Sequence, residues 1–264
     1  MKILDLSNIK NVYFIGDIHC EFSSVVNDLI VRKKITDAVV LCCGDIGMGF
    51  YREGYYHSLF RHLNGKLSAK NVVMVMFRGN HDNPDYFNDG GLPGSINDAF
   101  SRYSNMYLIP DYSIVKTSVG NILCVGGGIS IDRISRELNV SYWENEQVIE
   151  LDDERKKFIT DNLPIDIVCS HSSPQTAKPI QKYCGSFAVF DLKLPESMID
   201  ERVRLQEIYD FLAEISKPKH WIYGHFHITL DEIINGTRFH CCDMFRDERG
   251  KRGTDIYTIR RDED

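Results

Sequence analysis

Side chains that can bind metal ions or transfer protons follow five short apolar segments of the sequence, at the point where each segment ends. The five polar stretches are Gly16-Asp17-Ile18-His19, Gly44-Asp45, Gly79-Asn80-His81-Asp82, Ser170-His171 and Gly224-His225-Phe226-His227. Carboxylate, imidazole and amide groups suit Mn²⁺, Fe, Zn²⁺, Ni²⁺ or Mg²⁺. Two aspartates, one asparagine and four histidines are too many ligands for one tetrahedral ion. The set therefore predicts two ions that share one carboxylate.

The apolar segments before these stretches are predicted to be strands buried on both faces, because they are rich in β-branched residues and lack clean alternation. They cover residues 12–15, 38–42, 72–77, 122–125, 165–169 and 221–223, with closing strands at 238–245 and 256–259. Strand ends on one edge of a sheet converge on a rigid scaffold. In extended backbone, the spacing of Asp17-x-His19 and of His225-x-His227 would point both side chains of a pair the same way. Four glycines, Gly16, Gly44, Gly79 and Gly224, each precede a candidate ligand and would allow a sharp turn and close approach of the backbone.

Helices are expected between these strands. Apolar residues recur at helical spacing over residues 21–34 and 197–215, and a charged helix over 151–162 stops before Pro164. The mixture predicts an α/β protein whose strands lie between outer helices. We expect one domain over residues 1–264. The stretch 83–118, which begins rich in Gly, Asn, Asp and Pro, is predicted to be a loop or cap insertion.

Composition narrows the classes of function. The chain has 264 residues, 43% hydrophobic and 26% charged, enough to bury a core without structural metals. Its net charge of −7 disfavours a broad nucleic-acid-binding surface. It has neither a signal-peptide pattern nor an apolar run of about 18 residues that would span a membrane. We expect a cytoplasmic protein whose eight cysteines, which include no C-x-x-C pair, are mainly buried reduced thiols.

In kind and order, the five polar stretches resemble the motifs of the calcineurin-like metallophosphoesterase superfamily, from residue 16 to residue 227. The resemblance implies a four-layer α/β/β/α sandwich with two mixed central sheets flanked by helices. It also implies two divalent metal ions, with Mn²⁺ favoured. One ion would be held by Asp17, His19, Asp45 and His227. The other would be held by Asp45, Asn80, His171 and His225.

The resemblance also implies catalytic roles for the third stretch. His81 would face the substrate, where it would stabilise the transition state or protonate the leaving oxygen, and Asp82 would orient His81. As a general acid, His81 would contribute about 10²–10⁴-fold in rate. Two ions about 3.5–4 Å apart would lower the pKa of a shared water, and the hydroxide would attack phosphorus in line.

One further stretch, Gly126-Gly127-Gly128-Ile129-Ser130-Ile131-Asp132-Arg133, resembles small bacterial and phage members of the superfamily. Arg133 would clamp a phosphate oxygen there, since a guanidinium fork matches that geometry; the alternative is a surface arginine in a glycine-rich turn. Trp143 is interpreted as packing. After Gly44-Asp45 the sequence lacks the acidic residue and Arg-Gly that many members carry, which disfavours a close relative of the protein Ser/Thr phosphatases.

The sequence as a whole predicts hydrolysis of a phosphate ester, such as a nucleotide or a phosphoprotein. A nuclease with the same centre is the less favoured alternative because of the acidic net charge. An inactive binding scaffold of this fold is disfavoured because every ligand and His81 are retained. Four histidines match none of the motifs and are interpreted as structural or solvated: His57, His62, His220 and His240.

Overall fold

The computed structural model describes residues 1–87, 103–179, 188–246 and 253–259. Within them the strands form two sheets. The larger sheet contains, in spatial order, β1 (Ile3–Asp5), β6 (Ser113–Thr117), β7 (Gly120–Val125), β8 (Ile167–Ser170), β9 (His220–Tyr223), β11 (Thr237–Cys241) and β10 (Leu230–Ile234). The smaller contains β12 (Tyr257–Thr258), β2 (Asn11–Ile15), β3 (Ala38–Cys42), β4 (Val72–Met76) and β5 (Met106–Leu108). Each sheet combines parallel and antiparallel pairs, which confirms two mixed sheets.

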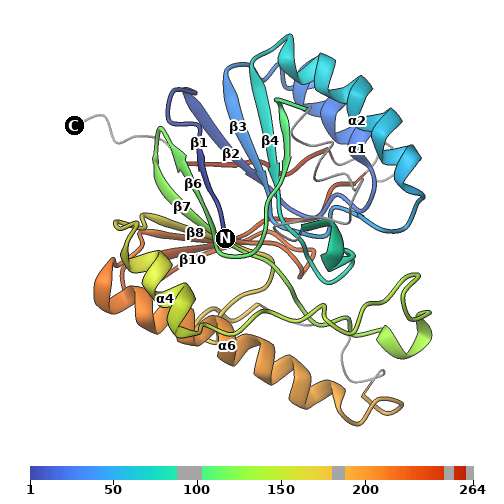
Figure 1. Cartoon of the computed structure of the whole chain (residues 1–264). Coiled ribbons are helices and arrows are strands. Elements are labelled where there is room, and N and C mark those ends of the chain that lie inside the picture. The colour runs from blue at the N-terminus through green and yellow to red at the C-terminus, as the bar shows by residue number, and fades with distance from the viewer. Residues whose placement is uncertain (88–102, 180–187, 247–252, 260–264) are drawn as a thin grey trace.

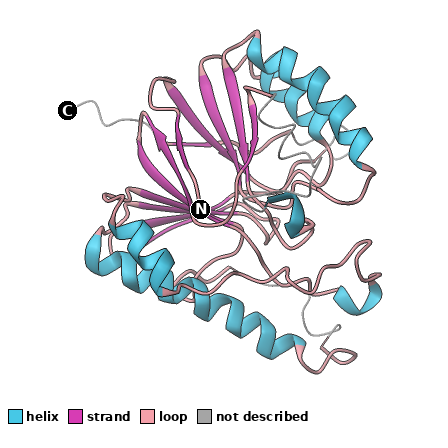
Figure 2. Cartoon of the chain, in the orientation of Figure 1, coloured by secondary structure: helices cyan, strands magenta, loops and turns pink. Residues whose placement is uncertain are grey.

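Helices cover the outer face of each sheet (Figures 1 and 2). On the smaller sheet lie α1 (Phe22–Asn27), its π-helical continuation η1 (Asp28–Arg32) and α2 (Glu53–Ser68). On the larger sheet lie α4 (Asp153–Thr160) and α6 (Leu194–Ile215). Two 3₁₀ turns, η2 (Pro84–Phe87) and η3 (Arg133–Ser135), lie in connections. The predicted order of helix, sheet, sheet and helix is confirmed.

The side chains of β3 show why this strand is apolar without alternation. Val40 packs under α1 and α2, whereas Val39 and Leu41 pack between the two sheets. Successive side chains of a strand point to opposite faces, so a strand of the inner layers needs apolar residues at every position. A third apolar layer packs α4 and α6 onto the larger sheet.

Four strands and one helix went unpredicted. β1 and β10 are half-exposed, which removes the buried-strand signal, and α2 carries Gly54 and Gly65, which lower helix propensity. The predicted insertion over 83–118 is wrong in its second half, because residues 106–108 and 113–117 are β5 and β6. Residues 88–102 lie outside the described residues.

Among the helices that the structure describes, none combines the length and the hydropathy needed to cross a bilayer.

Candidate metal centre

The carboxyl ends of five strands meet at one place in the molecule. β2, β3 and β4 run parallel in the smaller sheet, and β8 and β9 run parallel in the larger one. Every predicted ligand follows one of these five strands, and the structure brings all seven together: Asp17, His19, Asp45, Asn80, His171, His225 and His227.

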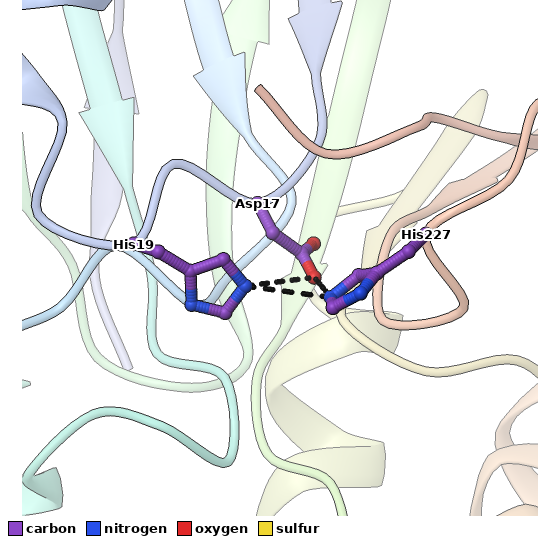
Figure 3. A group of neighbouring side chains, drawn as sticks. All are labelled: Asp17, His19 and His227. Carbon is purple, nitrogen blue, oxygen red and sulfur yellow. Dashed lines mark hydrogen bonds and ion pairs between the residues drawn. The ribbon is translucent and has the colours of Figure 1, made fainter. Parts of the chain in front are cut away.

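One group of ligands surrounds the carboxylate of Asp17. Figure 3 shows Asp17, His19 and His227 pointing toward one another from two different sheets. Oδ2 of Asp17 lies 2.9 Å from Nε2 of His227 and 3.8 Å from Nε2 of His19. The two imidazole nitrogens are 3.4 Å apart. The three side chains thus present one ligand atom each to a common point.

A second group surrounds Nε2 of His171, which is fully buried. This nitrogen lies 2.9 Å from Oδ1 of Asn80, 3.2 Å from Nδ1 of His225 and 3.3 Å from Oδ1 of Asp45. On the other side of the ring, Nδ1 lies 2.7 Å from the carbonyl oxygen of Cys43. That carbonyl can only accept, so the ring proton of neutral His171 belongs on Nδ1, and the lone pair of Nε2 faces the centre.

The atoms of both groups fit a bound cation. A neutral His171 directs a lone pair at oxygens of Asn80 and Asp45 that are themselves acceptors. Oδ2 of Asp17 is buried and has no hydrogen-bond donor with proper geometry, although Nε2 of His227 is close. Lone pairs that face one another in a buried site require a positive charge between them. A proton on His171 supplies it in the metal-free chain, since burial would lower the pKa of His171 but the charges of Asp45 and Asp17 raise it above its usual value, and a cation would replace that proton. The donor set therefore fits the divalent ions that the resemblance implies.

Asp45 connects the two groups. It belongs to one set of close ligand atoms with Asp17 and His171, and to another with His19 and His81. Its Oδ1 faces His171, while its Oδ2 lies 4.0 Å from Nε2 of His81. The two oxygens of Asp45 therefore face different neighbours, and its carboxylate lies between the two groups.

The ligand pairs converge through turns, and the expectation of extended backbone is wrong. His19, Asp45, His225 and His227 have φ angles of 41°, 45°, 67° and 52°. Residues with a Cβ rarely adopt this left-handed region, and such strain concentrates at functional sites. The turns send His225 toward His171 and His227 toward Asp17, so the two histidines of one motif belong to different groups.

Two glycines allow this close approach. A Cβ on Gly79 would overlap Oδ1 of Asp45, and a Cβ on Gly44 would overlap the ring of His171. Gly44 also has a φ of 86°, which favours glycine. The predicted role of these glycines is therefore confirmed at these positions.

Burial and neighbouring charges shift the pKa values of Asp45 and His225. Burial alone would raise the pKa of Asp45, but the nearby imidazoles, His171 foremost, lower it below its usual range. Burial, and next the charge of His171, lower the pKa of His225 to about 3. A charged carboxylate and a neutral imidazole are the forms that bind metal ions.

A family model for calcineurin-like phosphoesterases matches residues 10–229, more than half of the chain. The chain belongs to this family. It is a phosphoesterase, a hydrolase whose family uses divalent metals. Among curated protein sequences, none matches it.

Solved structures resemble the phosphoesterase in fold at low sequence identity. One crystal structure is 11% identical, with a TM-score of 0.54 over 95% of this chain and 99% of the other. A phosphopantetheinyl hydrolase from Mycobacterium tuberculosis is 13% identical, with a TM-score of 0.48 over 96% of each chain. An archaeal phosphodiesterase is 8% identical, with a TM-score of 0.40 over 95% of this chain and 100% of the other. Of these three, only the first has a TM-score above 0.5, and that likeness supports a shared fold.

Asp82 of the phosphoesterase supports the loop after Asp45 and makes no described contact with the ring of His81. Its fully buried carboxylate accepts hydrogen bonds from four backbone N–H groups, at 2.7–3.1 Å: Ile46, Gly47, Met48 and Gly79. Burial, and next the charge of Asp45, raise the pKa of Asp82 to about 6. The contacts that the structure describes for Asp82 hold the backbone around Asp45, and the predicted orientation of the His81 ring by Asp82 stays a prediction.

We expect Asp82→Ala to lower the free energy of unfolding by about 3 kcal/mol or more, because four buried donors lose their acceptor. Urea unfolding of the metal-free protein measures this. Asp85→Ala, which removes an exposed carboxylate three residues later, is the matched control. Equal stability of the two variants would contradict the assignment.

A chain of buried hydrogen bonds through Ser130 and Glu146 orients the side chain of Asn80. Nδ2 of Asn80 donates to Oγ of Ser130 at 2.9 Å, and Ser130 donates to Glu146 from Oγ at 2.5 Å and from its backbone N–H at 2.9 Å. The guanidinium of Arg78 holds this segment through the backbone carbonyls of Glu146 and Gln147. This chain of hydrogen bonds turns the amide oxygen of Asn80 toward His171. Sequence reasoning missed it, because nothing local marks Glu146 as buried.

The arginine that reaches the site is Arg136, which the sequence analysis did not identify. Its Nη2 lies 3.1 Å from Nε2 of His81. Arg133, predicted to clamp phosphate, instead pairs with Asp191 at 2.6 Å and donates to Ser197 at 3.2 Å. Both arginines lie in one short stretch of sequence, and only long-range contacts distinguish them. A second arginine three residues after the predicted one was the available signal.

Histidines outside the motifs have other surroundings. His57 lies 3.6 Å from Glu53 on α2, and His62 is exposed on the same helix. The ring of His240 stacks on Tyr257 with a centroid distance of 3.9 Å. These three contribute nothing to the metal centre.

The six cysteines in apolar segments are buried, and Cys20 is half-buried. Cys184 lies outside the described residues.

Proposed function

We propose that this phosphoesterase hydrolyses phosphate esters with two divalent cations, with Mn²⁺ favoured. The observation that carries the proposal is the position of Asp45 between two groups of converging ligand atoms. Asp17, His19 and His227 would complete one site with Asp45. Asn80, His171 and His225 would complete the other.

The cations would lower the pKa of a water molecule and neutralise charge that develops on the phosphoryl oxygens. The chain supplies the geometry. Asp17 and His171 are fully buried, which holds the ligands rigidly, while the side chains of His81, His19 and His227 are 21%, 27% and 41% exposed. A substrate therefore approaches from the side of these three histidines.

In the substrate complex, His81 would carry a proton at Nε2 and pass it to the leaving oxygen, whereas in the free chain this nitrogen accepts a hydrogen bond from Nη2 of Arg136. In the structure this nitrogen points to the open side of the site and lies 4.0 Å from Oδ2 of Asp45. A histidine in this position acts on the ester oxygen and needs no place among the ligands. Departure of an alkoxide without a proton is slow, so the contribution of His81 grows with the basicity of the leaving group.

A nucleotide or a phosphoprotein are the substrates that the sequence suggests, and a polynucleotide is less favoured because the net charge is −7. The cytoplasmic location stays a prediction. It is supported by the cysteines: the seven in the described part of the chain are free thiols, as is usual in a reducing compartment.

The test uses metal-free protein, with p-nitrophenyl phosphate and bis-p-nitrophenyl phosphate as substrates. Mn²⁺ should restore turnover, and calorimetry should give two ions bound per chain. One ion per chain would refute the shared carboxylate. Two bound ions without turnover of either ester would favour an inactive scaffold of this fold.

A further inference from the structure

The segment between β7 and α4 presents a positively charged side chain beside His81. Nε and Nη2 of Arg136 donate to the two carboxylate oxygens of Asp132 at 2.7 and 2.8 Å, and Nη1 donates to the carbonyl of Ser141 at 3.0 Å. Three anchored nitrogens fix the plane of the guanidinium. The side chain is 16% exposed, so Arg136 is held rigidly without being closed off from solvent.

The remaining hydrogen of Nη2 points to Nε2 of His81, at 3.1 Å. Arginine only donates hydrogen bonds, so the imidazole nitrogen accepts this one. His81 is partly exposed beside the metal centre, and its Nε2 lies 3.1 Å from Nη2 of Arg136 and 4.0 Å from Oδ2 of Asp45. A group bound to the cations and in contact with His81 therefore lies within reach of Arg136.

A phosphoryl oxygen is a better acceptor for this hydrogen than a neutral imidazole, because a bond between two charged groups is roughly twice as strong. We propose that Arg136 binds the phosphoryl group of the substrate, and that it makes the enzyme favour phosphomonoesters over phosphodiesters. This inference rests on the proposed function. Asp132 is the residue that positions Arg136.

The preference follows from counting oxygens. A monoester has three non-bridging phosphoryl oxygens and nearly two negative charges at neutral pH. If each cation takes one oxygen, a charged oxygen remains for Arg136. A diester carries a single charge and has only two such oxygens. Its third substituent is an uncharged ester oxygen, a poor acceptor for a guanidinium.

Arg133 provides a matched control in the same segment. It pairs with Asp191 at 2.6 Å and donates to Ser197 on α6, and Figure 1 shows this segment running beside α6. Removing the Arg133 side chain breaks one ion pair, as removing the Arg136 side chain does. The two arginines are about equally buried, since Arg133 is 14% and Arg136 is 16% exposed. Removing Arg133 leaves His81 untouched.

The experiment compares wild type, Arg136→Ala and Arg133→Ala, each loaded with Mn²⁺. For Arg136→Ala, kcat/KM for p-nitrophenyl phosphate should fall by about 10–100-fold, the effect of one hydrogen bond between charged groups. For bis-p-nitrophenyl phosphate it should fall by less than about threefold. Calorimetry with inorganic phosphate should give a Kd weakened by about tenfold or more, with unchanged metal content. Arg133→Ala should stay within about threefold of wild type in each measurement.

Equal losses on the monoester and the diester would overturn the preference. Equal losses for the two arginine variants would reduce Arg136 to a structural role in the segment. Phosphate binding distinguishes these results from failure of the proposed function. If wild type hydrolyses neither ester but binds phosphate, a weakened Kd in Arg136→Ala still supports the contact, and an unchanged Kd refutes it.

Discussion

Asp45→Asn should abolish metal-dependent turnover, a loss of at least about 10³-fold, while the protein stays folded. Asp45 lies close to ligand atoms of both groups, with Oδ1 3.3 Å from Nε2 of His171 and a carboxylate oxygen within 4.8 Å of a ring nitrogen of His19. Asparagine replaces one of these oxygens by an N–H₂ group, which repels a cation. The site that loses its carboxylate oxygen should bind its ion weakly, and calorimetry should find about one ion per chain.

The fold should tolerate this substitution for two reasons. Asp45 has a φ of 45°, and asparagine enters the left-handed region more readily than most residues. Its amide oxygen can also still accept the backbone N–H of His81, which lies 2.8 Å from Oδ1. Circular dichroism and the melting temperature of the metal-free protein check this expectation. Asp85→Asn is the control, and retained turnover in Asp45→Asn would refute the shared carboxylate.

His81→Ala should keep both metal ions and lose about 10²–10⁴-fold in kcat. The position of His81 supports a proton-transfer role, since its side chain is 21% exposed to solvent beside the predicted ligands. Its distance of 4.0 Å from Oδ2 of Asp45 also allows the rival assignment, a metal ligand beside His19. Metal content therefore decides between the two assignments.

Comparing substrates with different leaving groups tests the acid role of His81 more directly. An alkyl phosphate needs a proton on its departing oxygen, whereas p-nitrophenolate leaves readily without one. His81→Ala should therefore lose more activity on the alkyl ester. His62→Ala, on the exposed face of α2, should match wild type on both substrates. Loss of an ion in His81→Ala, or equal losses on both esters, would contradict the acid role.

The sequence by itself identified the seven candidate ligands and, through the family resemblance, the layers that carry them. Buried strands need apolar residues at every position, so β2, β3, β4, β8 and β9 are visible as apolar runs. A metal ligand that follows such a run marks the strand end, and parallel strands bring their ends together. This reasoning works because the signal is local, confined to a few residues of chain.

Only the tertiary structure decided how the supporting side chains are used. Arg133 and Arg136 are three residues apart, yet one meets Asp191, 58 positions away, and the other meets His81, 55 positions away. The family resemblance had already divided His225 and His227 between the two groups, but only the structure shows that left-handed turns direct them there. The carboxylate of Asp82 holds backbone N–H groups 34 to 36 positions earlier. Long-range hydrogen bonds and backbone torsions set these roles, and neither leaves a periodic pattern in the sequence.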